Sequence, residues 1–491
     1  MLEKIKRLGT DTAIYGVSTI IGRFVSFLLT PVYANMLAPG DLGVVATAFA
    51  YIAFLNVVYG YGMESAYFRY ATSREIGDDK QNFSVPFLSV LSTAVLFSGL
   101  LALNASAVSG LARIPVEFET IVASGALILG FDAIAVVPFA VLRLERKARR
   151  FAAIRIAGIL LNVGLNLLFL IRFHMGVEGI FLSNVISSGF ILLLLLPTIL
   201  SHLTVRWDTT LFRALLKFGL PNVPAGIATM MIQVIDRPIL EALTDKATVG
   251  IYQANYRLGV FMMLIVSTFD FAWRPFFLSH ASDPDARPLF ARILTYYTLL
   301  MSGVLLGLTL FLEDIVKVPL FWGRSILPEA YWSGLAIVPV VLLGYLFLGM
   351  SNNLVAGIYI EKKTHYLPPI TFVGAATNIL ANYLLIPRLG MMGAAVATLL
   401  SYFVMTVMVY LIGQRVYPVP HETGRILKIW GGAAIVFLLY QIVDAGALAI
   451  LWKTSLLVIF VGLMYAFRFF HPSEMRGIMA MLPMKRKSEE S

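Results

Sequence analysis

Long apolar runs recur along the whole chain and restrict it to one environment. Each run is long enough to cross the roughly 30 Å hydrocarbon core of a bilayer as a helix. With 491 residues, of which 59% are hydrophobic and only 13% are charged, and a mean hydropathy of +0.82, the chain is too apolar for an ordinary soluble protein. We therefore predict an all-α integral membrane protein.

We count fourteen spans in the sequence. They cover residues 12–36, 40–62, 84–108, 119–142, 151–173, 178–200, 214–240, 249–272, 290–312, 332–358, 366–387, 391–413, 426–445 and 448–470. The Lys and Arg residues test this count, because short cytoplasmic loops retain positive charge. With the N-terminus inside, inner segments carry 27 of them, outer loops carry 7, and four fall within spans. A miscounted helix would reverse this bias further along, so both termini are predicted to be cytoplasmic.

The net charge of +10 is explained by this topology. Basic cytoplasmic segments such as 143–150 and 485–487 lie against anionic headgroups, so no nucleic acid partner is needed. The first apolar run is a full span without a convincing cleavage site, and we expect it to remain as the first helix.

Several classes of site are excluded by what the sequence lacks. With no Cys, disulfides, thiol catalysis and cysteine metal sites are ruled out. No Gly-Lys dipeptide occurs, so there is no phosphate-binding loop of the G-x-x-x-x-G-K-[ST] type. The six His are scattered singly. We expect no metal and no cofactor, and an ion gradient of protons or sodium as the energy source.

The chain also repeats a series of landmarks. Two asparagines and an arginine recur at an offset of 216, a glycine pair at 214, and a proline and a glycine at 207: Asn162, Asn166, Arg172, Gly176, Gly179, Pro31 and Gly43 match Asn378, Asn382, Arg388, Gly390, Gly393, Pro238 and Gly250. The repeat unit is six spans. Because six is even, the two halves have the same orientation, as in transporters with parallel repeats.

This repeat predicts the domain organisation. We expect two parallel six-helix lobes, residues 1–213 and 214–424, with a substrate path in the cleft between them. Two peripheral helices at 425–470 and a cytoplasmic tail at 471–491 would lie outside the repeat.

Charged residues within spans are the best pointers to a site, because each costs about 2.5–3.5 kcal/mol near a helix centre on insertion scales. Arg23, Arg237 and Arg257 lie on helices 1, 7 and 8, which should line one cleft. A cationic wall of this kind suits an anionic ligand, and the guanidinium fork fits phosphate oxygens. The alternative for Arg23 is a structural partner such as Asp132.

Two carboxylates are candidates for ion coupling. Asp236 either neutralises Arg237 or binds a proton or cation during the cycle, as carboxylates do in coupled pumps. Neighbours on a helix point about 100° apart and need not pair. Asp132 is the second candidate. Arg155 lies about one turn inside its span, and we expect it to reach the inner surface.

Three further groups have a functional and a structural interpretation. The first group lies at corresponding inner ends of helices 2 and 8 and consists of Glu64, Arg69, Asp270 and Arg274. These residues form either an inner gate that closes by ion pairing or a set of weak surface pairs. The asparagine pairs are interpreted as interhelical packing rather than ligands. For the tyrosines of the outer mouth we favour an aromatic belt over sugar stacking; they are Tyr33, Tyr59, Tyr61, Tyr252 and Tyr256.

Several of these segments are similar to those of a known family. Arg23 with the apolar run to Pro31, the segment 37–43 with its Ala-rich continuation, and the passage 378–397 resemble polysaccharide biosynthesis proteins. These are the Wzx-type flippases of the multidrug/oligosaccharidyl-lipid/polysaccharide (MOP) exporter superfamily. The likeness covers helices 1 to 12 and consists of structural landmarks, so it indicates the fold better than the cargo.

The resemblance implies transport of an undecaprenyl-pyrophosphate-linked oligosaccharide across the cytoplasmic membrane of a bacterium, by alternating opening of two lobes. Arg23, Arg237 and Arg257 are where this chain meets the requirement for a pyrophosphate site. Helices 13 and 14 are present as in the lipid II flippase branch of the superfamily, where the resemblance suggests that they guide the lipid tail; many other members also have fourteen helices. A monomer is expected, with the polymerase and glycosyltransferases of the same pathway as partners.

Three other functions remain open at this stage. A lipid II flippase has the same fold. A multidrug exporter of the superfamily would carry acidic residues for cationic drugs, and the excess of Arg within spans disfavours it. A membrane glycan polymerase or ligase would show a large outer loop, which this chain lacks.

Overall fold

The computed structural model describes residues 22, 24–25, 27–320, 323–443, 446–470 and 474. Thirteen helical segments in these residues are long and apolar enough to cross a membrane, and each corresponds to one of the spans predicted from residue 40 onward. Of the first predicted span, 12–36, the structure describes residues 22, 24–25 and 27–36, which are helical. The predicted all-helical membrane fold is confirmed.

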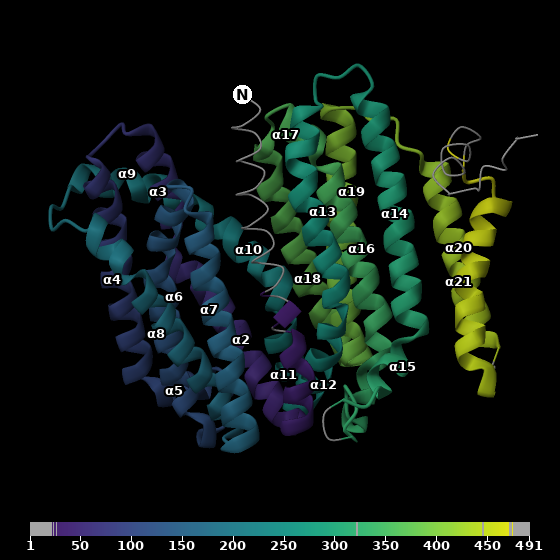
Figure 1. Cartoon of the computed structure of the whole chain (residues 1–491), viewed down its shortest axis with the longest axis horizontal. Coiled ribbons are helices and arrows are strands. Elements are labelled where there is room, and N and C mark those ends of the chain that lie inside the picture. Colours follow the sequence, from purple (N-terminus) through teal and green to yellow (C-terminus); the bar gives the residue numbers. More distant parts are fainter. Residues whose placement is uncertain are drawn as a thin grey trace, which may run out of the picture.

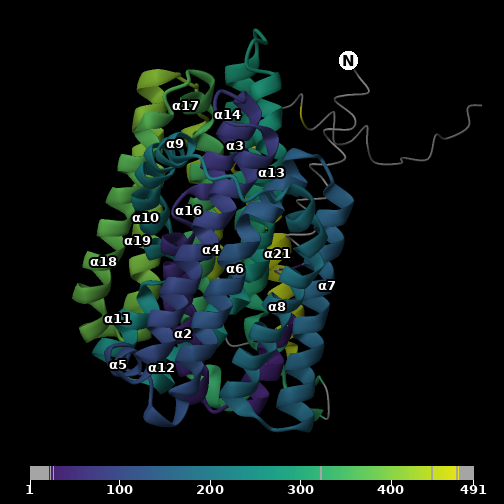
Figure 2. The same ribbon diagram turned by 90° about the vertical axis from the view of Figure 1, so that its left-hand side faces the viewer.

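The α-helices follow the chain in this order: α2 (Pro39–Gly60), α3 (Met63–Ser73), α4 (Asp79–Leu103), α5 (Ala105–Leu111), α6 (Thr120–Leu144), α7 (Ala148–Leu167), α8 (Gly176–His202), α9 (Thr209–Gly219), α10 (Val223–Val234), α11 (Asp236–Leu243), α12 (Lys246–Tyr256), α13 (Val260–Ser279), α14 (Ala286–Leu310), α15 (Leu312–Lys317), α16 (Val338–Leu354), α17 (Ala356–Ile360), α18 (Leu367–Leu389), α19 (Met391–Val416), α20 (Thr423–Ile442) and α21 (Ala449–Ala466). The side view of Figure 2 shows that the long helices run roughly parallel to one another.

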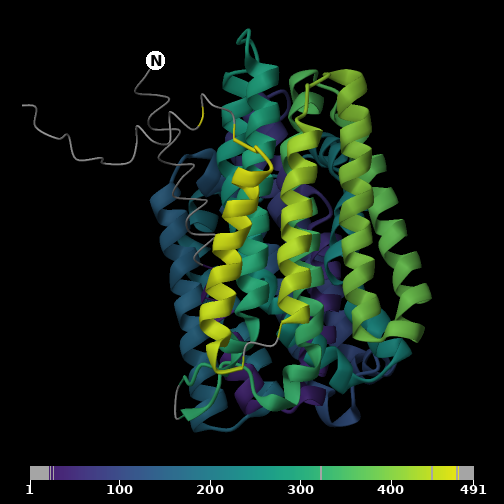
Figure 3. The same ribbon diagram turned by 90° about the vertical axis from the view of Figure 1, so that its right-hand side faces the viewer.

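The helices gather into two bundles. α2 to α8 form the first, at the left of Figure 1, and α10 to α19 form the second. The bundles converge at the edge where α11 and α12 lie, which the charge pattern predicts to be the outer face of the membrane. Toward the opposite, predicted inner edge, the ribbons diverge (Figure 1). The remaining pair, α20 and α21, lies at the far side of the second bundle and packs on α14 (Figure 3).

The two bundles meet through a reciprocal backbone contact. A Cβ atom added to Gly43 of α2 would overlap the carbonyl oxygen of Lys246, and one added to Gly250 of α12 would overlap the carbonyl oxygen of Pro39. Pro39 and Lys246 are themselves 207 residues apart, so the repeat relates each half of the contact to the other. We call these four residues the outer seam. Small residues are what allow two membrane helices to approach this closely.

The starts of the two seam helices are fixed locally. Pro39 is the first residue of α2, a position that suits its missing N–H and fixed φ. Asp245 caps α12, where its carboxylate accepts a hydrogen bond from the backbone N–H of Thr248 at 2.9 Å. That hydrogen bond lowers the pKa of Asp245. The seam therefore lies in the first turns of two well-defined helices.

Hydrogen bonds around the seam tie the bundles together on the same side. Arg113 Nη1 donates to the carbonyl of Ala242 at 3.2 Å. The Tyr331 hydroxyl donates to the carbonyl of Leu37 at 2.9 Å. With the glycine contact, these bonds close the structure at its predicted outer face.

The chain passes from one bundle to the other between α9 and α10. α9 packs against α3 and α4, and a Cβ atom on Gly62 would overlap the carbonyl oxygen of Gly219. α10 instead packs against α18 of the second bundle and also touches α2. The inner part of the seventh predicted span therefore stays with the first bundle.

Because of the close contact at the outer seam, we predict that alanine substitutions at two neighbouring glycines of α2 have very different effects on thermal stability. Gly43→Ala forces α2 away from α12, and we expect the thermal midpoint of the purified protein to fall by several degrees. Gly40→Ala is the matched control, because nothing lies within 4 Å of a Cβ atom there and alanine is the better helix former. Equal midpoints for the two variants in a thermal-shift assay in detergent would contradict the contact.

Candidate functional site

Two broken helices bring charged residues together beside the outer seam. α10 ends at Val234 and α11 begins at Asp236. Pro238 accounts for this break, because its ring crowds the carbonyl four residues earlier and its nitrogen cannot donate a backbone hydrogen bond. The second break is a short 3-10 turn, Arg257–Gly259, between α12 and α13. Interrupted helices form the binding sites of many transporters.

Arg237 and Asp236 form a buried ion pair at the first break. Arg237 Nη1 lies 2.6 Å from Asp236 Oδ1, and the side chains are only 8% and 1% exposed. Arg237 Nε also donates to Gln253 Oε1 at 3.0 Å, and the Tyr252 hydroxyl donates to Asp236 Oδ2. Both carboxylate oxygens of Asp236 are therefore occupied. In this arrangement Asp236 neutralises Arg237, the first of the two roles considered for it.

Aromatic rings continue the Arg237 pocket deeper into the second bundle. The guanidinium lies over the Tyr256 ring, 4.4 Å from its centroid. Tyr256 packs edge-on against Tyr345 at 6.1 Å, and Tyr345 lies next to Tyr402 at 6.4 Å. A cation over a ring face gains about 0.5–2 kcal/mol, and the gain is largest when water is excluded. The contacts of the Arg237 guanidinium thus come from its own bundle.

Arg257 lies close to this pair but has a different environment. Its guanidinium is 5.8 Å from the centroid of the Tyr33 ring, which belongs to the helical residues 27–36. Arg237 and Arg257 are near enough to repel each other. Among the described residues, no carboxylate forms an ion pair with Arg257. It is a cation at the junction of the two bundles whose charge is not neutralised by a described residue.

Arg23, the third predicted cation, lies outside the described residues. Asp132 of α6 interacts with Ser188 of α8 and with Arg155 of α7. The Arg155 guanidinium also lies over the Phe139 ring, 4.4 Å from its centroid. Asp132 and Asp236 thus belong to separate groups, and the structure does not bring the two predicted coupling carboxylates together.

The four residues of the predicted inner gate interact within their own bundles. Glu64 of α3 lies against Arg143 of α6, at 2.5 Å between Oε1 and Nη1. Arg69 stacks over the Phe218 ring at 5.3 Å. Asp270 Oδ1 lies 3.3 Å from Arg274 Nε, one turn along α13. In this arrangement no ion pair among these four residues joins one bundle to the other.

The repeated asparagine pairs adopt the same internal geometry. Asn166 Nδ2 donates to the carbonyl of Asn162 at 2.8 Å, and Asn382 Nδ2 donates to that of Asn378 at 2.8 Å. In the first bundle the Tyr33 hydroxyl then donates to Asn166 Oδ1 at 2.9 Å. These are packing contacts within and between helices.

The second bundle lacks that last bond. Leu240 stands 207 residues after Tyr33 and has no hydroxyl group. Asn382 Oδ1 is accordingly buried without a hydrogen-bond partner among the described residues, as is Asn378 Nδ2. The two halves of the repeat therefore share their asparagine pairs but differ in the polar groups that surround them.

The expected aromatic belt is wrong for most of its members. Tyr33, Tyr59, Tyr252 and Tyr256 are 6%, 2%, 0% and 8% exposed within the protein. Residues of a belt must face the headgroup region, whereas these rings pack between helices. Tyr59 and Tyr61 moreover lie at the end of α2 opposite the outer seam, next to Glu64 of the predicted inner gate, so their expected place at the outer mouth is also wrong.

Similarity to known proteins identifies the family. A family described as "polysaccharide biosynthesis protein" matches residues 32–325, which is more than half of the chain. The chain belongs to this family. It is also 22% identical over 422 residues to an uncharacterized membrane protein of Methanocaldococcus jannaschii, covering 78% of this chain and 79% of that protein.

Solved structures show the same fold. The lipid II flippase MurJ in an inward closed conformation superposes with a TM-score of 0.73 at 16% identity, over 92% of this chain and 99% of the other. An inward-facing multidrug resistance MATE transporter of the MOP superfamily gives 0.65 at 15% identity, over 80% and 94%. This polysaccharide biosynthesis protein therefore has the MOP transporter fold, as the resemblance implied, and is a multi-pass membrane protein.

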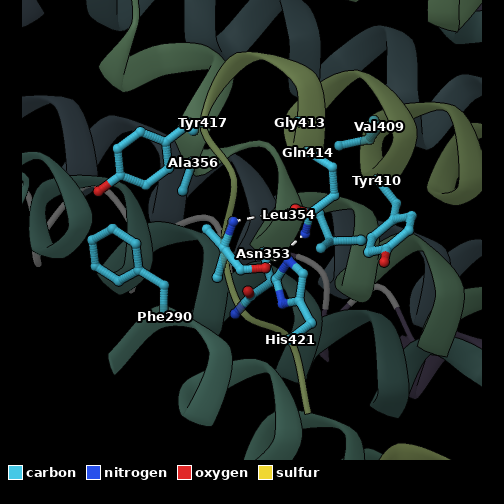
Figure 4. Close-up of a pocket in the computed structure, with 12 residues that line it drawn as sticks. Phe290, Asn353, Leu354, Ala356, Val409, Tyr410, Gly413, Gln414, Tyr417 and His421 are labelled. Carbon is cyan, nitrogen blue, oxygen red and sulfur yellow. Dashed lines mark hydrogen bonds between the residues drawn. The ribbon is translucent and has the colours of Figure 1, made fainter. Parts of the chain in front are cut away.

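A small cavity at the predicted inner end of the second bundle is a separate feature. It measures about 20 Å³, enough for one water molecule and far too small for a glycan. Polar and aromatic side chains line it, with His421 and Asn353 close together in Figure 4. His421 Nδ1 and Asn353 Nδ2 have no hydrogen-bond partner among the described protein residues. The cavity therefore has both the volume and the polar groups that a buried water requires.

Sequence patterns do not reveal several residues of the site. Gln253, Tyr345 and Tyr402 surround Arg237 or its ring contacts but are uncharged residues of ordinary apolar helices. Glu241 escapes a search for charges within spans, because it lies one residue beyond the predicted seventh span. Pro238 is a usable signal, since it marks the break at which the ion pair forms.

The buried ion pair predicts non-additive stability. Arg237→Ala leaves the Asp236 carboxylate buried and unpaired, so we expect a loss of about 3–5 kcal/mol. The double variant Asp236→Ala, Arg237→Ala removes both charges and should lose less than the sum of the two single variants. Unfolding of the four proteins in mixed micelles measures the coupling. Additive losses would show that the two charges act independently.

Burial lowers the pKa of His421 to about 4, so the folded protein keeps this ring neutral. The unfolded chain takes up the proton nearer pH 6.5. Acidification through this interval therefore favours unfolding. We expect His421→Gln to lose about 2 °C less in thermal midpoint between pH 7.5 and pH 5 than the parent. His365→Gln, at an exposed histidine, should behave as the parent; identical profiles for both variants would refute this assignment.

Proposed function

We propose that this polysaccharide biosynthesis protein is a flippase for a polyprenyl-pyrophosphate-linked oligosaccharide in the cytoplasmic membrane. The observation that carries the proposal is Arg257. It is a cation at the junction of the two bundles, beside a helix break, with no paired carboxylate among the described residues. The cost of keeping such a charge in a membrane indicates a ligand that supplies the missing negative charge.

The ligand chemistry follows from the kind of cation. Arginine presents a planar fork of donors that matches two oxygens of a phosphate at once. Arg237, 20 residues earlier, adds positive potential but keeps its own carboxylate at 2.6 Å. In this proposal Arg257 contacts the pyrophosphate directly. Arg237 and its aromatic neighbours contribute to the electrostatic potential at the pyrophosphate. Arg23 of the first helix would complete the cationic lining.

The fold is suited to alternating access. The bundles are held together at the seam on the predicted outer side and diverge toward the inner side (Figure 1), an arrangement suited to loading from the cytoplasm. The predicted gate residues Glu64, Arg69, Asp270 and Arg274, which interact within their bundles here, would re-pair across the inner side when the outer side opens.

The energy source is proposed to be an ion gradient. Asp236 would exchange its bond with Arg237 for a proton or cation during the cycle, and Asp132, which interacts with Arg155, is the second carboxylate available. The chain is proposed to act as a transporter and not as an enzyme, with the lipid-linked glycan and the bilayer as its binding partners.

A lipid II flippase is the second candidate. MurJ gives the larger TM-score of the two structures described above, and the superposition covers 92% of this chain. Lipid II also carries a pyrophosphate, so the Arg257 site suits it equally well. The matching family description favours a polysaccharide precursor.

The proposal predicts a difference between the two arginines. Arg257→Ala should reduce lipid-linked glycan transport at least tenfold while the thermal midpoint stays within about 2 °C of the parent, because no described ion pair is broken. Arg237→Ala should lose both transport and stability. Transport is measured with the purified chain in liposomes loaded with polyprenyl-pyrophosphate glycan or with lipid II, which also separates the two candidate substrates.

Arg257→Lys is the conservative control. It keeps the charge but loses the two-pronged geometry, and it should restore transport only in part. Full transport by Arg257→Ala with either lipid would overturn the assignment of this residue to pyrophosphate binding.

A further inference from the structure

The outer seam buries a carboxylate that the ligand site does not use. Glu241 of α11 is 7% exposed, and its Oε2 atom has no hydrogen-bond partner among the described residues. It lies between the membrane-spanning segments Thr209–Val234 and Lys246–Ser279. Across the seam it faces Thr47 of α2, whose buried hydroxyl also lacks a well-formed hydrogen bond. A side chain from one bundle is thus desolvated by the other.

The cations near Glu241 offset the cost of burying its carboxylate only in part. Lys246 Nζ is 3.8 Å from Oε1, at the limit of an ion pair, and its side chain is 34% exposed. Arg113 also acts on the carboxylate from the first bundle, and Tyr51 of α2 is its titratable neighbour. Arg113 directs Nη1 to the carbonyl of Ala242 instead. Neither cation donates a hydrogen bond to the unpartnered Oε2.

Closing the seam therefore changes the affinity of Glu241 for a proton. When the bundles separate, water can reach the carboxylate and stabilise its charge. When they close, burial penalises the charged form more than the neutral one. In the closed arrangement burial raises the pKa of Glu241 against the opposing effects of the Thr47 hydroxyl, Lys246 and Arg113. By linkage, acidification favours the closed seam and alkaline conditions favour the open one.

We propose that Glu241 is a proton-binding latch of the outer seam, whose protonation stabilises the arrangement closed to the outside. The latch and the ligand site share one helix, since Glu241 follows Arg237 by a single turn of α11. This inference rests on the alternating access of the proposed function, but it concerns the position of the bundles and needs no substrate.

The absence of Cys from the sequence permits a direct measurement of the seam. Ala38 precedes α2 and Leu243 ends α11, and both are exposed. Each is replaced by Cys and spin-labelled. Pulsed electron paramagnetic resonance on the full chain in nanodiscs then gives the distribution of distances between the labels. This readout depends on neither lipid-linked glycan nor transport.

We expect the fraction with the short distance to rise at least about twofold between pH 8 and pH 5. Glu241→Gln, which mimics the protonated side chain, should hold the short distance at both pH values. Glu117→Gln changes an exposed acid outside the seam and should keep the response of the parent. Lys246→Met removes the nearest positive charge, so the midpoint of the response should move to higher pH.

Two results would overturn the latch. One is a distance distribution that does not change with pH in the parent, and the other is a response that survives unaltered in Glu241→Gln. Thermal midpoints of the labelled proteins show that each variant is folded. Because Arg257→Ala tests the ligand site by transport, failure of the latch leaves the proposed function standing, and failure of transport leaves the latch measurable.

Discussion

The close crossing of α2 and α12 is the contact on which the rest of this structure depends. At both glycines, the position of a missing Cβ atom is taken by a carbonyl oxygen of the other helix. The two halves of the contact correspond under the sequence repeat, as expected for parallel lobes related by an axis along the membrane normal. This contact places α11 beside α2 and brings helix residues 27–36 against Arg257. Both the closed face, which the charge pattern predicts to be the outer one, and the candidate site follow from it.

The charged residues near the seam differ in how completely the cost of their burial is compensated. Arg237 is enclosed by a carboxylate, an amide and a tyrosine ring, so its burial is compensated within one bundle. Arg257 has a ring but no described carboxylate, and Glu241 has two cations nearby but an oxygen without a partner among the described residues. When a ligand, a proton or water arrives, the free energy of such incompletely compensated groups changes most. Binding and gating can therefore act through them.

The spans can be predicted from the sequence because hydropathy and loop charge are local properties. Gly43 and Gly250 also appear in the repeat as a matched pair, but their role as a contact point is not predictable. A glycine in the sequence indicates that space is needed near its backbone, but it does not indicate which segment occupies that space. The site is predictable in part. The cost of charge in a membrane identifies Asp236 and Arg237, whereas a continuous helix suggests that they need not pair. Both residues lie in α11, and the long Arg237 side chain nevertheless folds back so that its Nη1 reaches the carboxylate of its neighbour.

The departures from the repeat explain how a symmetric frame can work in one direction. Tyr33 and Leu240 occupy equivalent positions, and so do Leu29 with Asp236 and Thr30 with Arg237. The charged groups of the described site lie on α11, α12 and the turn that follows, all in the second bundle. In the proposed cycle, a ligand held there would stay with one lobe while the other moves past it. Since Arg237 and Glu241 are one turn apart on α11, opening of the seam at Glu241 would shift the Arg237 guanidinium and with it the electrostatic potential at Arg257. In the proposed cycle, a single short helix would then couple the gate to the site.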